Sequence, residues 1–220
     1  MLSDNGAQLK RLVKRLRGAP KGGTAALKRR LCCGGQTWAK EATALSSSHD
    51  NHTTERFHFE DDGVIPNHPR FELLVHRAAF APEPGEPAVS AEQLFGANGW
   101  GGFWRDGIYP FHHYHSTCHE ALGVARGWAE VRFGGESGGR TLRLEAGDVA
   151  VLPAGTGHRR IAASDDFQVV GAYPPGQPFD LIRDAGDHDA AVTRIGAVPT
   201  PATDPVFGPD GGLRTAWKTD

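Results

Sequence analysis

Four side chains in two short segments have the types and spacing that suit one metal ion. The segment from Gly107 to Gly127 contains His113, His115 and Glu120, and the segment from Gly147 to His158 ends on a third imidazole. Neutral imidazoles with one carboxylate suit Fe, Mn, Ni, Co, Cu or Zn better than Ca or Mg, which prefer oxygen ligands. We therefore expect one divalent transition metal as cofactor, with its identity open among these six.

The elements around the first segment can bring its three side chains to one place. Side chains alternate faces along a strand, so His113 and His115, two residues apart, point the same way. Residues 116–119 are short and polar, which favours a hairpin turn, and Glu120 then begins the returning strand. Three metal ligands are thus expected from one hairpin.

The second segment supplies the fourth ligand through a turn. Pro153 and Gly155 form a Pro-x-Gly turn directly after the Val-rich strand Val149–Leu152. Such a turn reverses the chain, so that His158 begins the next strand facing the same interior. The predicted metal ligands are therefore His113, His115, Glu120 and His158.

Both segments resemble the two motifs of the cupin superfamily. The first resembles Gly-x5-His-x-His-x4-Glu-x6-Gly, with these residues at the specified positions: Gly107, His113, His115, Glu120, Gly127. The second resembles Gly-x5-Pro-x-Gly-x2-His-x3-Asn, through these residues: Gly147, Pro153, Gly155, His158. It departs at Ala162, where the family usually has Asn. The resemblance is to single-domain bacterial cupins, and it implies a double-stranded β-helix, or jelly roll, with a metal inside.

The composition agrees with an all-β fold. The chain of 220 residues has 39% hydrophobic residues, enough for one sizeable core, and its 29 Gly and 15 Pro indicate many turns. We expect a basic, disordered N-terminal extension over 1–54, the cupin barrel over 55–185, and an irregular C-terminal segment, 186–220, packed on the barrel. Short helices are expected only at the periphery.

Local patterns predict the elements of the barrel. The expected strands are Phe71–Phe80, Gly102–His115, Ala121–Ala125, Ala129–Phe133, Thr141–Leu144, Val149–Leu152, His158–Ala163 and Phe167–Tyr173. A short helix, Ala91–Leu94, is expected after a Ser90 cap. The strand Gly102–His115 places these residues in one phase facing the interior: Phe103, Arg105, Tyr109, Phe111, His113, His115.

The first 50 residues differ in charge from the rest. They carry a net charge of +7, whereas the whole chain has −2. Leu9, Leu12 and Leu16 have helical spacing among basic residues, which allows a short amphipathic helix. A transit-like presequence, a contact with an anionic surface and a contact with nucleic acid are open alternatives, but a solvated tail is favoured because so polar a segment packs poorly.

The remaining features concern the compartment and partners. Cys32, Cys33 and Cys118 do not form an evident set of disulfides, which favours a reducing, cytoplasmic location. No apolar run approaches the ~18–20 residues that span a bilayer. We expect neither a membrane nor a nucleic-acid partner, and the resemblance implies a homodimer.

The site predicts chemistry on a small polar molecule. Glu120, Tyr109 and Arg160 are the candidate catalytic residues: Glu120 as a base, Tyr109 as a donor or acid, and Arg160 as a contact for an anionic substrate. Packing for Tyr109 and a place at the barrel rim for Arg160 are the plainer alternatives. We predict a metal-binding protein that is a metal-dependent enzyme of dioxygenase or isomerase type; the alternative is a non-catalytic protein that binds or senses a small ligand. The sequence leaves the substrate open.

Overall fold

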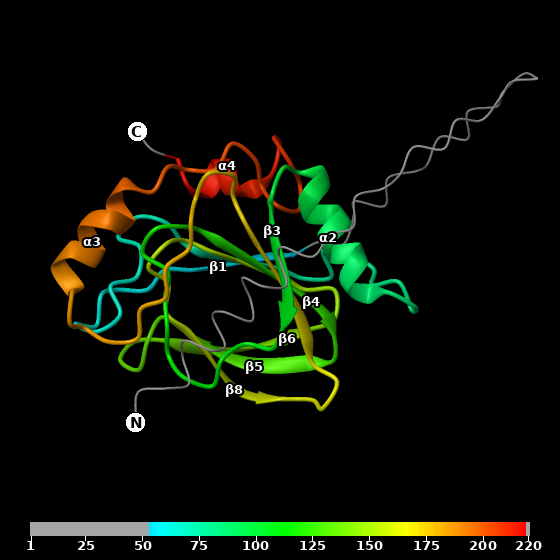
Figure 1. Ribbon diagram of the computed structural model, residues 1–220, viewed down its shortest axis with the longest axis horizontal. Coiled ribbons are helices and arrows are strands. Elements are labelled where there is room, and N and C mark those ends of the chain that lie inside the picture. The colour runs from blue at the N-terminus through cyan, green and yellow to red at the C-terminus, as the bar shows by residue number, and fades with distance from the viewer. Residues whose placement is uncertain (1–52, 219–220) are drawn as a thin grey trace, which may run out of the picture. The chain divides into compact units, whose positions relative to one another are not determined.

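The computed structural model describes residues 53–218, and its architecture is mainly β (Figure 1). Nearly all of the predicted basic extension lies outside these residues. Within them, nine strands form two antiparallel sheets, one with the order β1-β2-β7-β4-β9-β3 and one with the order β6-β5-β8. The strands are β1 Thr54–Phe57, β2 Leu73–His76, β3 Gly101–Asp106, β4 Glu120–Arg126, β5 Trp128–Phe133, β6 Arg140–Glu145, β7 Val149–Leu152, β8 His158–Ala163 and β9 Gln168–Tyr173. The predicted all-β jelly-roll fold is confirmed.

The interior between the two sheets is the first core. It takes alternate residues from both sheets, for example Leu122 of β4, Val131 of β5 and Leu144 of β6, each at most 1% exposed. Each such aliphatic side chain contributes on the order of 2 kcal/mol through burial. This core holds the two sheets together, and the ligand-bearing strands β4 and β8 border it.

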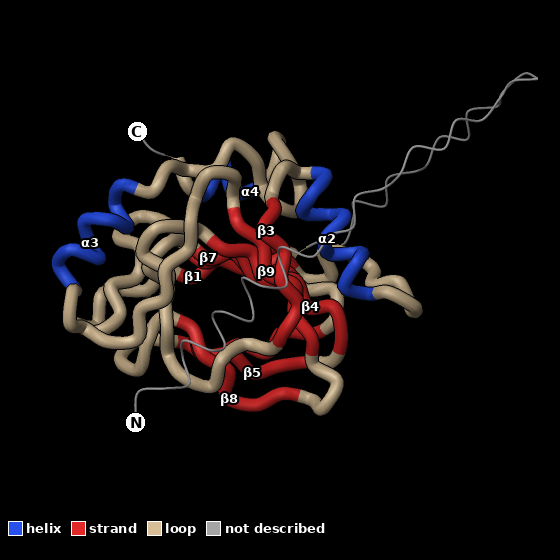
Figure 2. Tube along the Cα trace, in the orientation of Figure 1, coloured by secondary structure: helices blue, strands red, loops and turns tan. Residues whose placement is uncertain are grey.

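A second core covers the outer face of the six-stranded sheet. The other phase of the same strands, including Val149 and Val151 of β7, packs there against Phe95 of helix α2, Pro87–Ala97. Because both faces of β7 are covered, its four residues are all buried. Figure 2 shows the helices only on the outside of the strands.

Two further helices lie in the C-terminal stretch. Helix α3 spans His188–Ala197 and α4 spans Gly212–Ala216. Ile195 of α3 packs with Ile65 and Tyr114 in a small third core beside the loops that carry the histidines.

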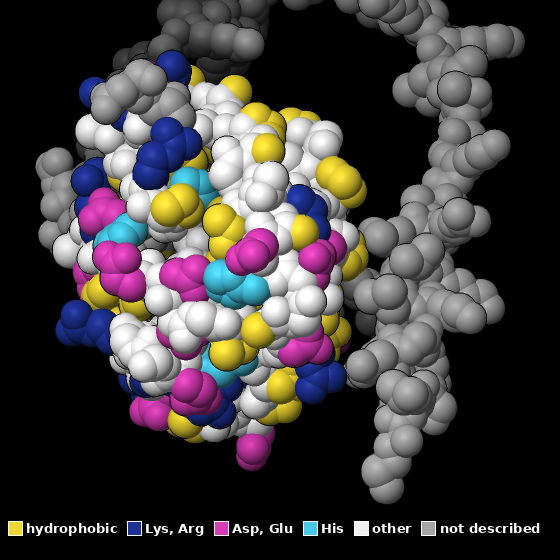
Figure 3. Space-filling model, turned by 90° about the vertical axis from the view of Figure 1, so that its left-hand side faces the viewer, with side chains coloured by type: hydrophobic (Ala, Val, Ile, Leu, Met, Phe, Trp, Pro, Cys, Tyr) yellow, Lys and Arg dark blue, Asp and Glu magenta, His cyan; other side chains and the backbone are white. Residues whose placement is uncertain are grey.

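Among residues 53–218, none of the helices has the length and apolar character of a membrane span. On the face in Figure 3, acidic and basic side chains are interspersed.

The predicted strands Val149–Leu152 and His158–Ala163 have the observed bounds, but the long strand Gly102–His115 is wrong. Strand β3 ends at Asp106, and the chain to Phe111 has no regular strand because Pro110 lacks a backbone donor. The alternation is consequently lost between β3 and the histidines.

The common interior phase is also wrong for two residues of β3. Phe103 packs in the outer core, and the Arg105 guanidinium forms an ion pair with Glu92 of α2 at 2.6 Å. The side chain that points into the interior is Trp104. Faces alternate regularly from Phe103 to Arg105, so the phase of the histidines fails to reach β3 because residues 107–111 between them have no regular strand.

The predicted short helix is wrong in its bounds. It begins at Pro87 rather than Ala91, and Glu86, not Ser90, is the capping position. Proline is favoured in the first helical turn because its missing N–H has no partner there. The Ser90 hydroxyl instead accepts a hydrogen bond from the Glu83 N–H.

Candidate metal centre

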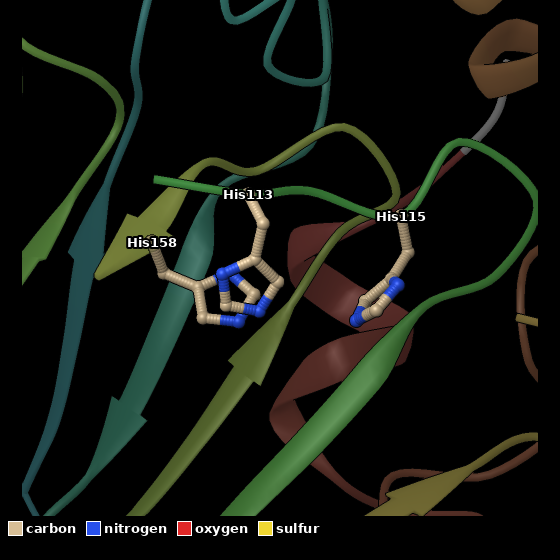
Figure 4. A group of neighbouring side chains, drawn as sticks. All are labelled: His113, His115 and His158. Atoms are coloured by element: carbon tan, nitrogen blue, oxygen red, sulfur yellow. The ribbon is translucent and has the colours of Figure 1, made fainter. Parts of the chain in front are cut away.

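Three buried imidazoles from separate segments form one group. His113, His115 and His158 each offer a nitrogen, and these nitrogens all lie within 4.8 Å of one another. Figure 4 shows the His113 and His158 rings side by side, with His115 facing them from the other side. All three residues are at most 7% exposed. This is a group that could hold a metal ion, as the sequence predicted.

A backbone bridge places His113 beside His158. The His158 N–H donates to the His113 carbonyl at 2.9 Å, and the His113 N–H donates back to the His158 carbonyl at 3.2 Å. Directly opposed residues in an antiparallel bridge project their side chains to the same face. The ring centroids are consequently 4.0 Å apart, although His113 belongs to no regular strand.

The turn before β8 is tied to His115. The Gly155 N–H donates to the His115 carbonyl at 2.7 Å. Gly155 has φ of +87°, and a Cβ there would lie 2.7 Å from Ile195 Cδ1 and 2.8 Å from the Asn67 carbonyl oxygen. Only glycine fits this conformation and this space. The Pro-x-Gly turn therefore joins the two histidine segments, as well as reversing the chain.

The backbone fixes which nitrogen each histidine presents. The Nδ1 of His113 lies 3.2 Å from the Phe111 carbonyl oxygen, and the Nδ1 of His158 lies 3.1 Å from that of Thr156. The Nδ1 of His115 contacts the Asp180 carbonyl oxygen. A carbonyl oxygen only accepts, so each Nδ1 carries the proton and the lone pair of the neutral ring is on Nε2. This is the second-layer arrangement that metal-binding histidines use.

The Asp180 carbonyl, which accepts from His115 Nδ1, is held in place by a hydrogen-bond network that includes Ser116 and Arg194 of α3. The Asp180 carboxylate accepts hydrogen bonds from the N–H and the hydroxyl of Ser116. The Ser116 hydroxyl oxygen accepts a bond from Arg194 Nε of α3 at 2.7 Å. The Phe179 ring lies 6.0 Å from the His115 ring. Residues 179–180 and helix α3 therefore orient the His115 ring.

Glu120 lies beside the three imidazoles at the start of β4. Its Oε2 is 3.5 Å from Nε2 of His115 and 3.5 Å from Nε2 of His158. Among the described residues this buried oxygen has no hydrogen-bond partner. A buried oxygen without a partner is costly, so its place beside the imidazoles indicates an occupant of the group.

Burial and the neighbouring charges shift the pKa values of these four residues in opposite directions. Burial lowers the pKa of His158 to about 4 despite the nearby Glu120, and burial together with His158 holds the pKa of His113 far below its ordinary value. Burial acts against the charged form of Glu120, but its neighbours, foremost His115 and His158, together outweigh burial and lower the carboxyl pKa. Burial also acts against the charged form of His115, but Glu120 and Asp180 together outweigh burial and raise the pKa of this imidazole. At neutral pH, His113 and His158 are therefore neutral and Glu120 is charged, and His115 becomes a ligand by giving up the proton that Glu120 favours.

These residues fit a divalent transition metal. The donor set has three Nε2 lone pairs and one carboxylate oxygen without a partner, and mixed imidazole and carboxylate donors suit such metals. His112 and His119, which adjoin proposed ligands in sequence, are not members of the group among the described residues. The geometry therefore brings three of the predicted ligands, His113, His115 and His158, into one group, and Glu120 lies beside that group without being a member of it.

The structure also brings Tyr109 and Arg160 to this region. The Arg160 N–H donates to the Tyr109 carbonyl at 2.8 Å, and the Tyr109 ring lies 5.2 Å from that of His113. Arg160 stands opposite Val131, an interior residue of β5, so both project to the inner face. Tyr109 stacks on Phe111, and the Arg183 guanidinium lies 3.8 Å above that ring.

Two side chains near the histidine group were not predicted. The Tyr173 ring lies 6.1 Å from the His115 ring, and Trp104 Nε1 donates to the Tyr173 hydroxyl at 2.9 Å. Alternation along β9 could have found Tyr173, because Val169 is an interior residue and Tyr173 follows it by four. Trp104 was missed because the predicted strand carried the phase of the histidines back to β3 across residues 107–111, which have no regular strand.

Comparison with known proteins gives one strong match. No family model matches the chain. Over 165 residues, which are 74% of this chain and 96% of the other protein, the sequence is 38% identical to the uncharacterized protein YjlB of Bacillus subtilis (strain 168).

Solved structures match over shorter parts. A Bacillus subtilis oxalate decarboxylase is 16% identical with a TM-score of 0.31, over 52% of this chain and 24% of that chain. Acireductone dioxygenase from Bacillus anthracis, with a cadmium ion in its active centre, is 19% identical with a TM-score of 0.29, over 39% of this chain and 57% of that chain. The match thus spans about a quarter of the decarboxylase chain and just over half of the dioxygenase chain.

Proposed function

We infer the function of this chain from its buried histidines. The chain belongs to the cupin superfamily and to the same family as the Bacillus subtilis protein YjlB. We propose that it is a metal-dependent enzyme, of dioxygenase or isomerase type, that acts on a small polar molecule. The observation that carries the proposal is the common orientation of His113, His115 and His158. Each donates through Nδ1 to a carbonyl and leaves Nε2 for a metal.

The protein's own residues would hold the metal and orient the substrate. His113, His115, His158 and Glu120 would be the ligands, and the metal would supply Lewis-acid or redox chemistry to a small molecule that reaches it. Burial of all four side chains excludes water from their surroundings, which strengthens electrostatic interactions there. A small substrate is therefore favoured over a macromolecule.

We further propose that Arg160 anchors an anionic or carbonyl-bearing part of the substrate, with Tyr109 beside it. Among the described residues no carboxylate forms an ion pair with Arg160, although it projects to the inner face of its sheet. A partly buried guanidinium without a partner favours an anion, and the pair contributes about 1.5–3 kcal/mol. The Tyr109 carbonyl accepts from the Arg160 N–H and its ring lies 5.2 Å from the His113 ring, so its hydroxyl is proposed as a donor.

Arg159 offers a matched control for this role. It is the neighbour of Arg160 on β8 but stands opposite Arg132, on the outer face, and its guanidinium pairs with Glu136 at 2.7 Å. Replacing either arginine by alanine removes the same charge from the same strand. Only the replacement of Arg160 should affect a ligand inside the sheets.

The test combines metal analysis with substrate screening. The purified protein should contain metal, and O2 uptake and product formation are measured with small carboxylates, diketones, phenols, thiols and sugar derivatives. Arg160→Ala should keep the metal and lose about tenfold or more of the preference for carboxylates over neutral analogues, while Arg159→Ala keeps it. Equal affinities in Arg160→Ala and the parent would assign Arg160 to packing at the rim. Ligand binding without turnover across the panel would identify a binding protein instead of an enzyme.

We propose that the protein acts as a cytoplasmic homodimer, without nucleic-acid or membrane partners. The support is the family resemblance and the cysteine content rather than any contact within the described residues. Light scattering measures the mass in solution. The mass of a single chain, 23.6 kDa, would contradict the dimer.

A further inference from the structure

Asn67 is a buried residue, 2% exposed, in the loop between β1 and β2. Its Nδ2 donates to the Gly134 carbonyl at 2.7 Å and to the Glu60 carbonyl at 2.8 Å, while the Ile65 carbonyl is farther away at 3.5 Å. Its Oδ1 accepts from the Gly157 N–H at 3.2 Å. Because these partners are carbonyls on one side and an N–H on the other, the site requires a side chain that both donates and accepts.

The carboxamide of Asn67 interrupts the pairing of β5 with β8. Phe133 stands opposite His158, so Gly134 stands opposite Gly157. Two opposed residues of an antiparallel pair can exchange two hydrogen bonds. Here only the bond from the Gly134 N–H to the Gly157 carbonyl is direct, at 2.8 Å. The Gly157 N–H and the Gly134 carbonyl bind the Asn67 side chain instead. Asn67 therefore bridges the two strands at the residue just before His158.

The backbone of Asn67 holds the same turn at a second point. Its N–H donates to the Gly155 carbonyl at 3.1 Å. Gly155 and Gly157 flank Thr156, whose carbonyl oxygen lies 3.1 Å from Nδ1 of His158. Both neighbours of the residue that orients the His158 ring are thus hydrogen-bonded to Asn67.

The loop that carries Asn67 is itself fixed. The Asp62 carboxylate accepts from the N–H groups of Val64 at 3.0 Å and Ile65 at 2.7 Å. Ile65 packs so closely on the turn that a Cβ at Gly157 would lie 2.5 Å from its Cγ2. Asn67 has φ of +53°, a left-handed conformation that asparagine adopts more readily than most other residues. The loop therefore presents the carboxamide as a rigid anchor for the turn.

We propose that Asn67 is a positioning residue for the metal site. It holds residues 155–157 so that the Thr156 carbonyl accepts from Nδ1 of His158, and Nε2 is left for the metal. The proposal rests on metal binding at the histidine group and not on the reaction carried out there.

Two variants of the full-length chain test this role. Asn67→Asp keeps the shape but replaces the donor Nδ2 by an oxygen that faces two carbonyls. Asn67→Gly keeps the left-handed backbone and removes the carboxamide without adding a charge, so it decides the question if the aspartate variant does not fold. The affinity for Co(II) is measured by competition with a chelator. Losing an outer partner of a metal-binding histidine costs about 10–100-fold, and since Asn67 acts through Thr156 we expect about tenfold in each variant.

Asn98 offers a matched control. Its Nδ2 also donates to two backbone carbonyls, those of Pro205 at 2.8 Å and Val206 at 3.0 Å, in the stretch before α4. Asn98→Asp makes the same change of atoms without touching the turn before β8, so the Co(II) affinity should stay within about twofold of the parent. Denaturant unfolding of the metal-free proteins is measured alongside, so that a general loss of stability is distinguished from a loss of metal binding.

Nitrogen NMR of the isotope-labelled, metal-free protein gives a second readout. The chemical shifts at neutral pH show which nitrogen of each neutral imidazole carries the proton. In the parent, His158 should carry it on Nδ1. In both Asn67 variants the His158 proton should be shared between the two nitrogens, whereas His113, whose acceptor is the Phe111 carbonyl, should keep its own on Nδ1.

Parental Co(II) affinity, or an unchanged His158 proton position, in the folded Asn67 variants would overturn the proposal and leave Asn67 a purely structural residue. An equal loss of affinity in Asn98→Asp would assign the effect to stability and would overturn it as well. A parent that binds no Co(II) would overturn the metal site, whereas the NMR of the metal-free protein would still decide whether Asn67 orients His158.

Discussion

Two groups of buried histidines differ in the direction of their hydrogen bonds. In His113, His115 and His158, each Nδ1 donates to a backbone carbonyl. In His68 and His119, each Nδ1 instead accepts from backbone N–H groups, those of Arg70 and Phe71 for His68 and that of Ala154 for His119. Both groups are nearly inaccessible to water.

The difference shows that burial alone does not distinguish a ligand from a structural histidine. A ring whose Nδ1 donates has its lone pair on Nε2, available to a metal, whereas a ring whose Nδ1 accepts has its proton on Nε2. His68 stacks on Phe71 at 4.1 Å and packs as an aromatic ring. The direction of one backbone hydrogen bond therefore separates the two roles.

The largest effect is expected when one of the metal-binding histidines is replaced. His115→Ala and His158→Ala should each lower the metal content of the purified protein sharply, because each removes one of few donors. His112→Ala, the control, removes a half-buried imidazole that does not belong to the group among the described residues. Metal is measured by elemental analysis, and circular dichroism should show an unchanged β fold. Unchanged stoichiometry in both ligand variants would refute the metal site.

The second prediction uses the pH dependence of the structural group. Burial lowers the pKa of His68 to about 4, below its ordinary value of 6.5. Between these two pH values His68 is protonated in the unfolded chain but neutral in the folded chain. Its contribution to the free energy of unfolding is therefore fully present above pH 6.5 and is lost as the pH falls toward 4. By linkage, this residue should cost about 2 kcal/mol of unfolding free energy between pH 7.5 and pH 5.

His68→Asn tests this assignment, because its side-chain oxygen can accept from the same N–H groups and does not titrate. Denaturant unfolding is measured at both pH values with a chelator present, so that metal does not contribute. The variant should lose about 2 kcal/mol less than the parent over this interval. An equal loss in both proteins would show that the titration of His68 does not affect stability.

The third prediction separates His115 from the other ligands. Its Nδ1 acceptor is Asp180, which is 65 residues away, while the acceptors of His113 and His158 are two residues away. Asp180→Ala removes the carboxylate that Ser116 holds, so the Asp180 carbonyl should lose its position and metal affinity should fall about tenfold. Asp184→Ala, an exposed acidic residue nearby, is the control. Equal affinities in the two variants would leave His115 independent of this network.

The smallest effect is expected from the N-terminal segment. Deleting residues 1–50 removes a polar, basic stretch with few apolar residues and leaves β1, which begins at Thr54. Neither histidine group should respond. Calorimetry should show a melting temperature within about 2 °C of the parent, with full metal content. Loss of soluble protein or of metal would make the segment an integral part of the fold.

The sequence predicted the features that depend on neighbouring residues. The Pro-x-Gly turn and the strands on either side of it have local patterns, and so β7 and β8 have the expected bounds. The spacing of His113 and His115 placed both in one group even though the strand expected to carry them is absent. The conclusion held because the His113–His158 bridge supplies the orientation that the strand was expected to give.

Features that depend on distant partners were not predictable. Asp180 is recognised only through its contact with His115, and it has no local pattern of its own. Strand β1 was missed because Thr54–Phe57 is short, and its pairing with β2 decides its conformation. The side chains that orient the ligands are thus harder to predict from sequence than the ligands themselves.

The link between His115 and the C-terminal stretch has a consequence for biosynthesis. A ribosome makes the chain from the N-terminus, so His115 emerges 65 residues before the Asp180 carbonyl that orients it, and Arg194 follows later still. We expect nascent chains arrested before Asp180 to bind Co(II) weakly and chains that also expose α3 to bind it as the released protein does. Metal would then enter only after translation of the barrel is complete, and an incomplete chain would not sequester scarce metal from the cell.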